Sequence, residues 1–592
     1  MNVLVKSFLS ISILLFLSFA NYDFEDWKDK VDPLILENLS KGDQSDFIIQ
    51  MKSQASIKIE SGYKTKLEKS SQVYKQLTQI AKNSQKEAID MLQKNNTPFK
   101  SYWIVNVIYT KGDIHLVEQI ARLNSVAKIT RNQRLVVQET TPVNTFSRGG
   151  GGVEWGIDNI GADRVWALGY HGEGVVVAGQ DTGVEWFHPA IKNKYRGLID
   201  SLNVDHNYNW HDAIHTIIGG GTADANPCGV DIDHPCDDYN HGTHTIGTMV
   251  GGEDDLGTKI GVAPKSKWIA CRNMERGNGT PVTYIECFQW LMAPTDINNE
   301  NPRIDKSPDV INNSWGCPNS EGCDTTNYAI MEKVVDNVKA AGIVVVVSAG
   351  NSGNGGCGTV SAPAAIYENS FTVGATADID VIANFSSKGP VIIDGSNRMK
   401  PNISAPGVNV RSCIRNGLYA NWNGTSMAGP HVAGVVALMI SANPSLSGQV
   451  ETIENIIEST ARKHTYDNEL CGQDTLNAIP NNAYGYGIID AFAAVKKALA
   501  FVTDSKNMDN QFEINITPNP IHDFANLKIA HSTGDIEWSL FNVNGQMVMH
   551  KNMASNSSDF NQELDLRNLS AGVYFYQLNI GENIFHGKLV RE

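Results

Sequence analysis

Three residues whose side chains can cooperate in hydrolysis lie far apart in the chain, each in a short glycine-rich motif. Asp181 opens Asp-Thr-Gly, His241 opens His-Gly-Thr-His, and Ser426 is the third residue of Gly-Thr-Ser-Met-Ala. A serine hydroxyl is a weak nucleophile at neutral pH, and it becomes reactive when an imidazole takes its proton and a third group orients that imidazole. The residue types therefore predict nucleophilic catalysis if the fold brings them together.

The elements around these motifs are suited to positioning reactive groups. Ser426 stands at a glycine-rich turn before the apolar stretch 435–440, which predicts a buried helix, so backbone N–H groups and the positive end of the helix dipole converge near its hydroxyl. His241 also opens a predicted helix. The run 175–184 predicts a buried strand that delivers Asp181, and a buried carboxylate requires a partner.

In the chain order Asp, His, Ser, the three motifs closely resemble those of the subtilisin-like serine peptidases. The details of residues 268–320 are closest to the bacillopeptidase F group. The resemblance implies that Ser426 is the acylated nucleophile, that His241 is the general base and acid, and that Asp181 orients the imidazole. It also implies that Asn351, after the buried strand 344–347, donates to the oxyanion.

The same resemblance implies a groove in which an extended peptide substrate pairs as an added strand. Its walls would be formed by two tripeptides, Ser314-Trp315-Gly316 and Ser348-Ala349-Gly350. Trp315 is expected to narrow the groove. A rival hypothesis stays open, namely a catalytically inactive protein that uses the peptidase scaffold for surface binding. For His244 and His431, close to the motifs, we expect packing roles.

No cofactor is required for the predicted chemistry. Many subtilisins carry a calcium-ligating aspartate directly after the His-Pro that follows the catalytic acid, but here His188-Pro189 is followed by Ala190, so calcium is unsupported at that position. Calcium also favours acidic loops. For the loop that holds Asp231, Asp233, Asp237 and Asp238, both a solvated loop and a calcium loop are open, and we favour the solvated one.

The first twenty residues predict a signal peptide, because Lys6 precedes an apolar stretch that ends at small residues, and hence a secreted or cell-surface protein. No later stretch is expected to approach the eighteen apolar residues of a membrane-spanning helix, so no transmembrane anchor is predicted. The expected partners are protein or peptide substrates, and nucleic acid is not expected.

Residues 21–145 differ from the rest of the chain, because they hold 18 Lys and Arg against 15 Asp and Glu, whereas the whole chain has a net charge of −16. Their pattern resembles the inhibitory prosegments of subtilisins, and opposite charge would favour docking on the acidic remainder. The predicted elements are strand 46–52, a long helix 64–93, strand 102–110, helix 113–123 and short strands to 137. We expect maturation between about Val137 and Val153, near the glycine run 149–152.

Residues 146–502 are predicted to form the catalytic domain, a doubly wound parallel-sheet α/β fold with its active site at the carboxyl ends of the strands. A linker follows at 503–511. Residues 512–592 alternate apolar and polar residues around an Asn544-Gly545 turn, which predicts a small β-sandwich. It resembles the sorting tails of type IX secretion, which would engage outer-membrane secretion machinery. A carbohydrate- or surface-binding module is the alternative.

All nine cysteines lie between Cys228 and Cys471, and no Cys-x-x-Cys pair is present. In a secreted protein this pattern favours structural disulfides over zinc. Close spacing favours three pairs, and the odd count leaves at least one thiol free. The pairs are Cys228 with Cys236, Cys271 with Cys287, and Cys317 with Cys323.

Overall fold

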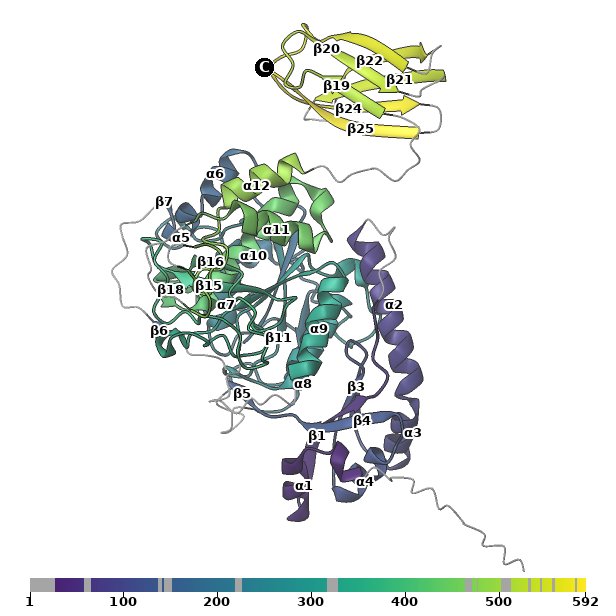
Figure 1. The fold of residues 1–592 in the computed structure, drawn as a ribbon, viewed down its shortest axis with the longest axis vertical. Helices are drawn as coiled ribbons and strands as arrows, with labels where there is room; N and C mark the ends of the chain where they lie inside the picture. Colours follow the sequence, from purple (N-terminus) through teal and green to yellow (C-terminus); the bar gives the residue numbers. More distant parts are fainter. Residues whose placement is uncertain are drawn as a thin grey trace, which may run out of the picture. The chain divides into compact units, whose positions relative to one another are not determined.

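The computed structural model divides the chain into two compact units, Met1–Phe501 and Val502–Glu592. Figure 1 shows both. The predicted signal peptide, the linker and the glycine run 149–151 lie outside the described residues. The described residues are 27–57, 65–136, 141–142, 152–218, 226–316, 328–463, 471–475, 478–501, 513–530, 534–542, 546–555, 559–580 and 583–592.

The centre of the first unit is a seven-stranded sheet in which every neighbouring pair is parallel, as predicted. Its strands are nearly continuous apolar runs, because both faces of a parallel sheet are covered by helices. In spatial order they are β16 (Ile403–Pro406), β15 (Phe371–Thr376), β14 (Val344–Ser348), β13 (Val310–Asn313), β8 (Val176–Asp181), β11 (Lys267–Arg272) and β9 (Trp210–Asp212).

Helices cover both faces of this sheet (Figure 1). One face packs against a cluster that contains α7 (His241–Val250), α10 (Thr425–Ala442) and α12 (Ala491–Ala500). The other packs against α8 (Pro281–Met292) and α9 (Tyr328–Ala340). The doubly wound α/β class is therefore confirmed.

Helix α10 supplies much of the core. Among the described residues it is the one helix long and apolar enough to cross a membrane by length and composition, with a mean hydropathy of 1.3. The expectation that no later stretch approaches this limit was wrong. The helix is 89% buried inside the protein, so its apolar surface contacts the sheet and the neighbouring helices.

Residues 27–136 form an N-terminal module with its own sheet, in the order β2-β3-β1-β4, and its own apolar core. The predicted helix 64–93 is two helices that meet at Gln85, and the predicted strand 102–110 is the end of one strand, a turn and the next strand. The elements are α1 (Pro33–Ser40), β1 (Ser45–Met51), α2 (Lys66–Ser84), α3 (Lys86–Lys94), β2 (Phe99–Tyr102), β3 (Val107–Gly112), α4 (Ile114–Ala121), β4 (Val126–Arg131) and β5 (Leu135–Val136).

Both departures have one cause, the buried side chain of Gln85. Its amide donates to the carbonyl of Tyr102, at 3.1 Å, and to the side chain of Asn106, at 2.9 Å, both at the turn between β2 and β3. Asn106 adopts a positive φ of 50°, which fits a turn residue. A polar contact between distant segments therefore fixes both the helix corner and the turn.

Short helices and strands complete the first unit, among them a hairpin of β17 and β18 that leads into α10. They are η1 (Trp27–Lys30), β6 (Thr141–Pro142), β7 (Gly152–Val153), α5 (Trp155–Asn159), α6 (Ala162–Ala167), η2 (Lys192–Lys194), β10 (Thr258–Lys259), β12 (Asn278–Gly279), η4 (Ile304–Lys306), η6 (Gly353–Gly355), β17 (Val410–Ile414), β18 (Leu418–Asn423), η7 (Pro444–Leu446) and α11 (Val450–Thr460).

The second unit consists of two antiparallel sheets around a core that contains Leu527, Trp538 and Leu578, as predicted for a small all-β domain. The predicted Asn544-Gly545 turn lies outside the described residues, and the strands on either side of it pair. The strands are β19 (Glu513–Thr517), β20 (Phe524–Ala530), β21 (Gly534–Asn542), β22 (Met547–Ser555), β23 (Asp559–Asp565), β24 (Gly572–Ile580) and β25 (Asn583–Arg591).

Disulfides join Cys228 to Cys236 and Cys271 to Cys287, as predicted. The predicted pair of Cys317 and Cys323 lies outside the described residues. A further bond joins Cys357 to Cys471 across 114 residues, and spacing could not reveal it. Cys413 is free and buried.

Candidate active site

Asp181 and His241 form a buried ion pair at one end of the parallel sheet. Asp181 is the last residue of β8, and His241 is the first residue of α7. The imidazole Nδ1 lies 2.8 and 2.9 Å from the two carboxylate oxygens, and both side chains are almost fully buried. The other ring nitrogen, Nε2, is buried without a hydrogen-bond partner among the described residues. It is therefore available to take a proton.

Glycines allow this close arrangement. A Cβ on Gly242, beside His241, would lie 2.1 Å from the carbonyl oxygen of Gly183, and a Cβ on Gly183 would lie 1.8 Å from that of Cys236. Gly183 also has a φ of +102°, which favours glycine. The glycines in two of the three motifs thus let β8, the loop before α7 and α7 itself make direct backbone contact.

Ser426 is the second residue of α10, which packs beside α7. Its hydroxyl donates to the carbonyl of Ser314, at 3.2 Å. The return contact comes from the Ser314 hydroxyl, which donates to the carbonyl of Ser426, at 3.2 Å. Pro430 has no N–H to donate to that carbonyl four residues earlier, so Ser314 replaces the missing helical hydrogen bond. The end of β13 and the start of α10 are held together in this way.

The electrostatics of His241 favour its charged form. Burial lowers the pKa of His241, but the charge of Asp181, the hydrogen bond to Asp181 and the charge of Asp237 outweigh that effect, so the pKa lies above its ordinary value. The pair can therefore hold a proton on the imidazole once Nε2 has accepted one.

Asn351 lies three residues beyond β14 and contacts the start of α10. Its side-chain oxygen accepts from the N–H and from the hydroxyl of Thr425, both at 2.9 Å. Because both contacts fall on the carbonyl oxygen, the orientation of the amide is fixed beside the residue that precedes Ser426.

The two tripeptides expected to form the groove lie after neighbouring strands β13 and β14. Ser348 donates to the carbonyl of Thr425, at 2.9 Å, and the N–H of Gly350 donates to the Thr425 hydroxyl, at 3.1 Å. Ala349 is buried and Gly316 is half-buried. The backbones thus lie beside α10, where the resemblance puts them.

The ring of Trp315 does not narrow the groove, contrary to the expectation from the sequence. It is 3% exposed and stacks on Tyr284 of α8, with ring centroids 3.8 Å apart. It belongs to the apolar cluster on the α8 and α9 side of the sheet. The sequence could not show the direction of this side chain, because both faces of the sheet are apolar.

His244 and His431 have the packing roles expected of them. His244 donates to the carbonyl of Val410, at 3.2 Å, and stacks on Trp422, with ring planes 2° apart. Burial and the charge of His241 lower the pKa of His244 to about 3, and burial lowers that of His431 to about 4, so both rings are neutral. Trp422 also stacks near His241, with centroids 6.3 Å apart, a neighbour that the sequence did not reveal.

The residues present do not fit the calcium ion common in subtilisins. At the expected ligand position, Ala190 is buried and its N–H donates to His188 Nδ1, at 3.2 Å. Among the described residues, no group of three or more His, Cys, Asp and Glu side chains could hold a metal ion. No step below involves a metal.

The acidic loop is only partly solvated. Asp231 and Asp233 are exposed and contact His215 and His234. Asp237 and Asp238 are buried: Asp237 accepts from the start of α7, and Asp238 pairs with the buried Arg272. The favoured description of a solvated loop was therefore wrong for its second half, which forms part of the core behind the active site.

A carboxylate that orients an imidazole, beside the helix that begins with Thr425 and Ser426, is the arrangement expected of a serine hydrolase. Comparison with known proteins gives the family. Residues 172–487 match the subtilase family, and residues 515–592 match the secretion system C-terminal sorting domain. The chain belongs to the subtilase family, whose members are serine peptidases, and it is a secreted or cell-surface protein. The sorting-domain prediction is thereby confirmed over the binding-module alternative.

Three relatives show how far the similarity extends. Bacillopeptidase F of Bacillus subtilis (strain 168) is 38% identical over 501 residues, which are 80% of this chain and 32% of that protein. Subtilisin E of the same strain is 29% identical over 388 residues, 65% of this chain and 83% of the relative. Subtilisin of Bacillus pumilus is 31% identical over 313 residues, 52% of this chain and 91% of the relative. The chain thus spans about a third of bacillopeptidase F and most of each subtilisin.

The charges around His241 lead to a prediction about the pKa of its ring. Asp181→Asn removes the largest influence that raises the pKa of His241, so that pKa should fall by about one unit or more. The measurement is the pH titration of the ring by NMR in the full chain carrying Ser426→Ala. Asp378→Asn, at an exposed aspartate of the same unit, is the matched control and should leave the titration unchanged. An unchanged titration in Asp181→Asn would contradict the pairing.

Proposed function

We propose that the mature protein is a serine endopeptidase that hydrolyses peptide bonds of proteins through an acyl-enzyme on Ser426. The observation that carries this proposal is the state of His241: Nδ1 is bound to Asp181, while Nε2 is buried with no partner in the part of the chain that the structure describes, next to the helix that begins at Thr425. The family membership supports it.

The residues act in a defined order. Ser426 Oγ attacks the substrate carbonyl carbon while its proton passes to His241 Nε2, and Asp181 stabilises the resulting imidazolium. The negative charge that develops on the carbonyl oxygen is stabilised by the side-chain amide of Asn351 and the N–H of Ser426. The intermediate then breaks its C–N bond, and His241 returns the proton to the leaving amine. Water, activated by His241, hydrolyses the ester and releases Ser426.

The hydroxyl of Ser426 must rotate before this reaction, because it donates to Ser314 in the structure. Rotation about one side-chain bond is enough to redirect it. Catalytic hydrogen bonds are often formed only in the substrate complex, so this geometry is compatible with the proposed role.

We also propose that residues 21–145 are a prosegment that inhibits the enzyme until it is cleaved. Two strand pairings support this. β5 of the N-terminal module pairs antiparallel with β12, where Val136 opposes Asn278, and β6 pairs antiparallel with β18, where Thr141 opposes Asn423. Asn423 lies three residues before Ser426. Both pairings add a strand to backbone of the catalytic unit, which is how an extended peptide substrate binds.

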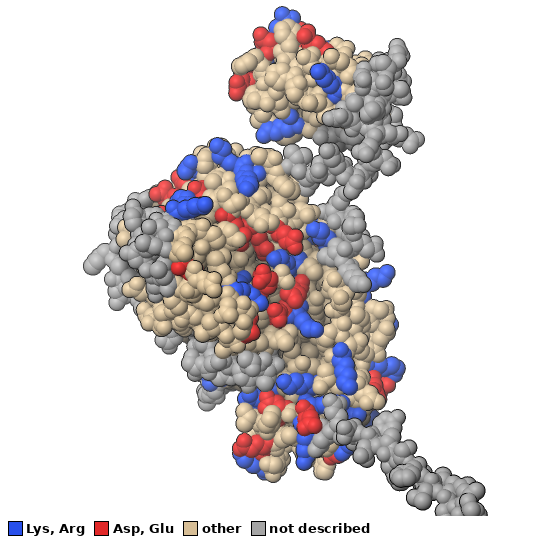
Figure 2. All heavy atoms as spheres, in the orientation of Figure 1, with Lys and Arg blue, Asp and Glu red and all other residues tan. Residues whose placement is uncertain are grey.

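Discrete polar contacts reinforce this docking. Lys66 Nζ lies 3.1 Å from Asp309 and donates to the carbonyl of Ser307, at 2.9 Å, and the Tyr102 hydroxyl donates to Glu286, at 2.5 Å. Apolar residues of the module, among them Val105, join the cluster that includes α8 and α9. On the face drawn in Figure 2, basic and acidic side chains are interspersed.

For the C-terminal unit, we propose that the sorting domain directs the protein to outer-membrane secretion machinery of the type IX route. Its match to the secretion system sorting domain supports this. The sorting domain accounts for export, whereas catalysis needs residues of the first unit alone.

The inactive-scaffold hypothesis is tested by covalent labelling. A serine-directed fluorophosphonate should label the mature secreted protein at Ser426 and abolish its hydrolysis of a casein substrate, because the reagent captures a serine that His241 activates. Ser426→Ala is the control and should not label. Folded mature protein that neither labels nor cleaves casein would establish the rival hypothesis.

The oxyanion role is tested by Asn351→Leu. Loss of one oxyanion donor should lower kcat by about 10²–10³ with little change in KM, because the contact forms in the transition state. The matched control is Asn354→Ala, at an exposed asparagine three residues further on, which should keep wild-type kinetics. A kcat within about twofold of wild type in Asn351→Leu would remove this residue from the proposal.

The prosegment proposal predicts the position of the cleavage site and a contact that retains the cleaved prosegment on the enzyme. N-terminal sequencing of the mature protein should find a start between residues 137 and 141. Lys66→Met removes the ion pair with Asp309 and should shorten the lag before casein hydrolysis by about tenfold or more. Lys75→Met, at an exposed position of the same helix, is the control. A mature start near Asn21, or equal lags, would contradict the proposal.

A further inference from the structure

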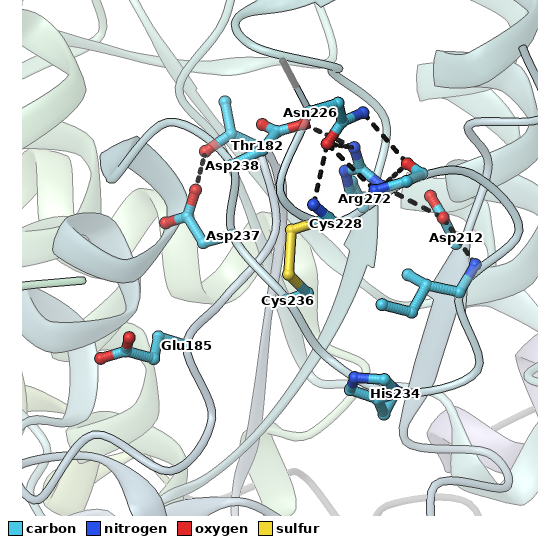
Figure 3. The surroundings of a disulfide bond; sticks show 12 residues. Thr182, Glu185, Asp212, Asn226, Cys228, His234, Cys236, Asp237, Asp238 and Arg272 are labelled. Atoms are coloured by element: carbon cyan, nitrogen blue, oxygen red, sulfur yellow. Dashed lines mark hydrogen bonds and ion pairs between the residues drawn. A yellow bond between two sulfur atoms is a disulfide. The ribbon is translucent and has the colours of Figure 1, made fainter. Parts of the chain in front are cut away.

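Asp237 is a buried carboxylate that is not part of the proposed triad but is fully engaged by donors. It is 3% exposed and accepts five hydrogen bonds. The donors are the Thr182 hydroxyl at 2.9 Å, the N–H groups of Tyr239 and Asn240 at 2.9 and 3.0 Å, and the N–H and hydroxyl of Thr243 at 3.0 and 2.6 Å. Figure 3 shows its contact with Thr182. Burial raises the pKa of Asp237, and the hydrogen bonds from these donors oppose that effect by favouring the charged form.

Three of these five donors, the Thr182 hydroxyl and both groups of Thr243, come from the two segments that carry Asp181 and His241. Thr182 follows Asp181, and its hydroxyl also accepts from the N–H of Gly242, at 3.0 Å. Thr243 lies in the first turn of α7, which begins at His241. A single carboxylate therefore ties the end of β8 to the start of α7, one residue from Asp181 on one side and two from His241 on the other.

The loop that carries Asp237 is itself firmly anchored. The disulfide between Cys228 and Cys236 ends at the residue directly before Asp237. The next residue, Asp238, pairs with Arg272, which is fully buried and also contacts Asp212 at 3.2 Å. Figure 3 shows the disulfide, Arg272, Asp237 and Asp238 around this loop. Asp237 is thereby fixed from both sides.

The charge of Asp237 also acts on His241. It is one of the influences that raise the pKa of His241, together with Asp181, and a carboxylate is favoured at the start of a helix. The other titratable groups that interact with this pair are His244 and Cys413 on the neighbouring elements and Asp238 in the same loop. Burial keeps His244 neutral and raises the pKa of the Cys413 thiol to about 12. Cys413 is therefore uncharged at neutral pH.

We infer that Asp237 is a positioning residue for the Asp181 and His241 pair: it fixes the distance and angle between β8 and α7, and its anion supports the protonated imidazole. This inference rests on the proposed function, in which His241 accepts the proton of Ser426. It gives the second half of the acidic loop a role in catalysis without contact with the substrate.

The decisive variant is Asp237→Asn. The asparagine amide has one oxygen where the carboxylate has two, so its NH₂ group must face N–H or O–H groups that donate to the second oxygen in the wild type. The negative charge is also lost. We expect kcat/KM to fall by about tenfold to a hundredfold, as for a small misplacement of catalytic groups. We also expect the acid limb of its pH profile to move to lower pH by about half a unit or more, because His241 loses a neighbouring anion.

The matched control removes the same charge from the same loop. Asp233 has 72% of its side chain exposed and contacts His234. Asp233→Asn should keep the wild-type rate and the wild-type acid limb. Rates are expressed per active site counted by fluorophosphonate labelling, so that a loss of folded protein does not count as a loss of catalysis.

A second pair of variants tests the geometry without changing any charge. Thr182→Val removes the hydroxyl that bridges Asp237 and Gly242, whereas Thr182→Ser keeps it. We expect kcat to fall by about tenfold in Thr182→Val and to return to near the wild-type value in Thr182→Ser, with the acid limb unchanged in both. If Asp237→Asn is not secreted, this pair alone decides the inference.

The outcomes separate the two proposals. Wild-type protein that neither labels nor cleaves casein overturns the proposed function, and the inference with it. Active wild-type protein with an unmoved acid limb in Asp237→Asn, or with equal rates in the two Thr182 variants, overturns the positioning role and leaves the proposed function intact.

Discussion

The buried hydrogen bond between Asp181 and His241 is the constraint on which the rest of the catalytic unit depends. A carboxylate and an imidazole taken out of water are costly unless they are paired with good geometry, and here the two groups lie 2.8 Å apart. The pairing requires that the last residue of β8 and the first residue of α7 meet. The glycines that allow backbone contact, the hydroxyl of Thr182 and the carboxylate of Asp237 all serve that requirement.

In the proposed function, the same architecture lets one surface serve both substrate and inhibitor. A sheet of parallel strands brings Ser314, Ser348 and Asn351 to one side of α10, and β12 and β18 each pair with a further strand. β5 of the N-terminal module pairs with β12, and β6, which follows the module in sequence, pairs with β18. The module's apolar residues continue the core on the α8 and α9 side, so its removal would expose apolar surface as well as open the active site.

Much of the fold could be predicted because local patterns and the global structure agree. Apolar runs bounded by turn residues predicted β8 and β14, and the glycine-rich motifs marked the helix starts at α7 and α10. The errors came from contacts between distant segments. Gln85 broke a helix that looked continuous, the Cys357–Cys471 bond spans 114 residues, and the Trp315 ring entered the core. None of these leaves a periodic or spacing signal in the sequence.

The sequence by itself determined the chemistry: the residue types of the triad, their order, the asparagine expected to stabilise the oxyanion, and the addition of a sorting domain. These depend on residue identity and on local turn and helix propensities, which short motifs carry. Only the tertiary structure decided which acidic residues are buried, that Asp237 joins two catalytic elements, and where the N-terminal module pairs with the catalytic unit. Burial and hydrogen-bond partners are set by the packing of segments that are remote in sequence, so no local pattern could determine them.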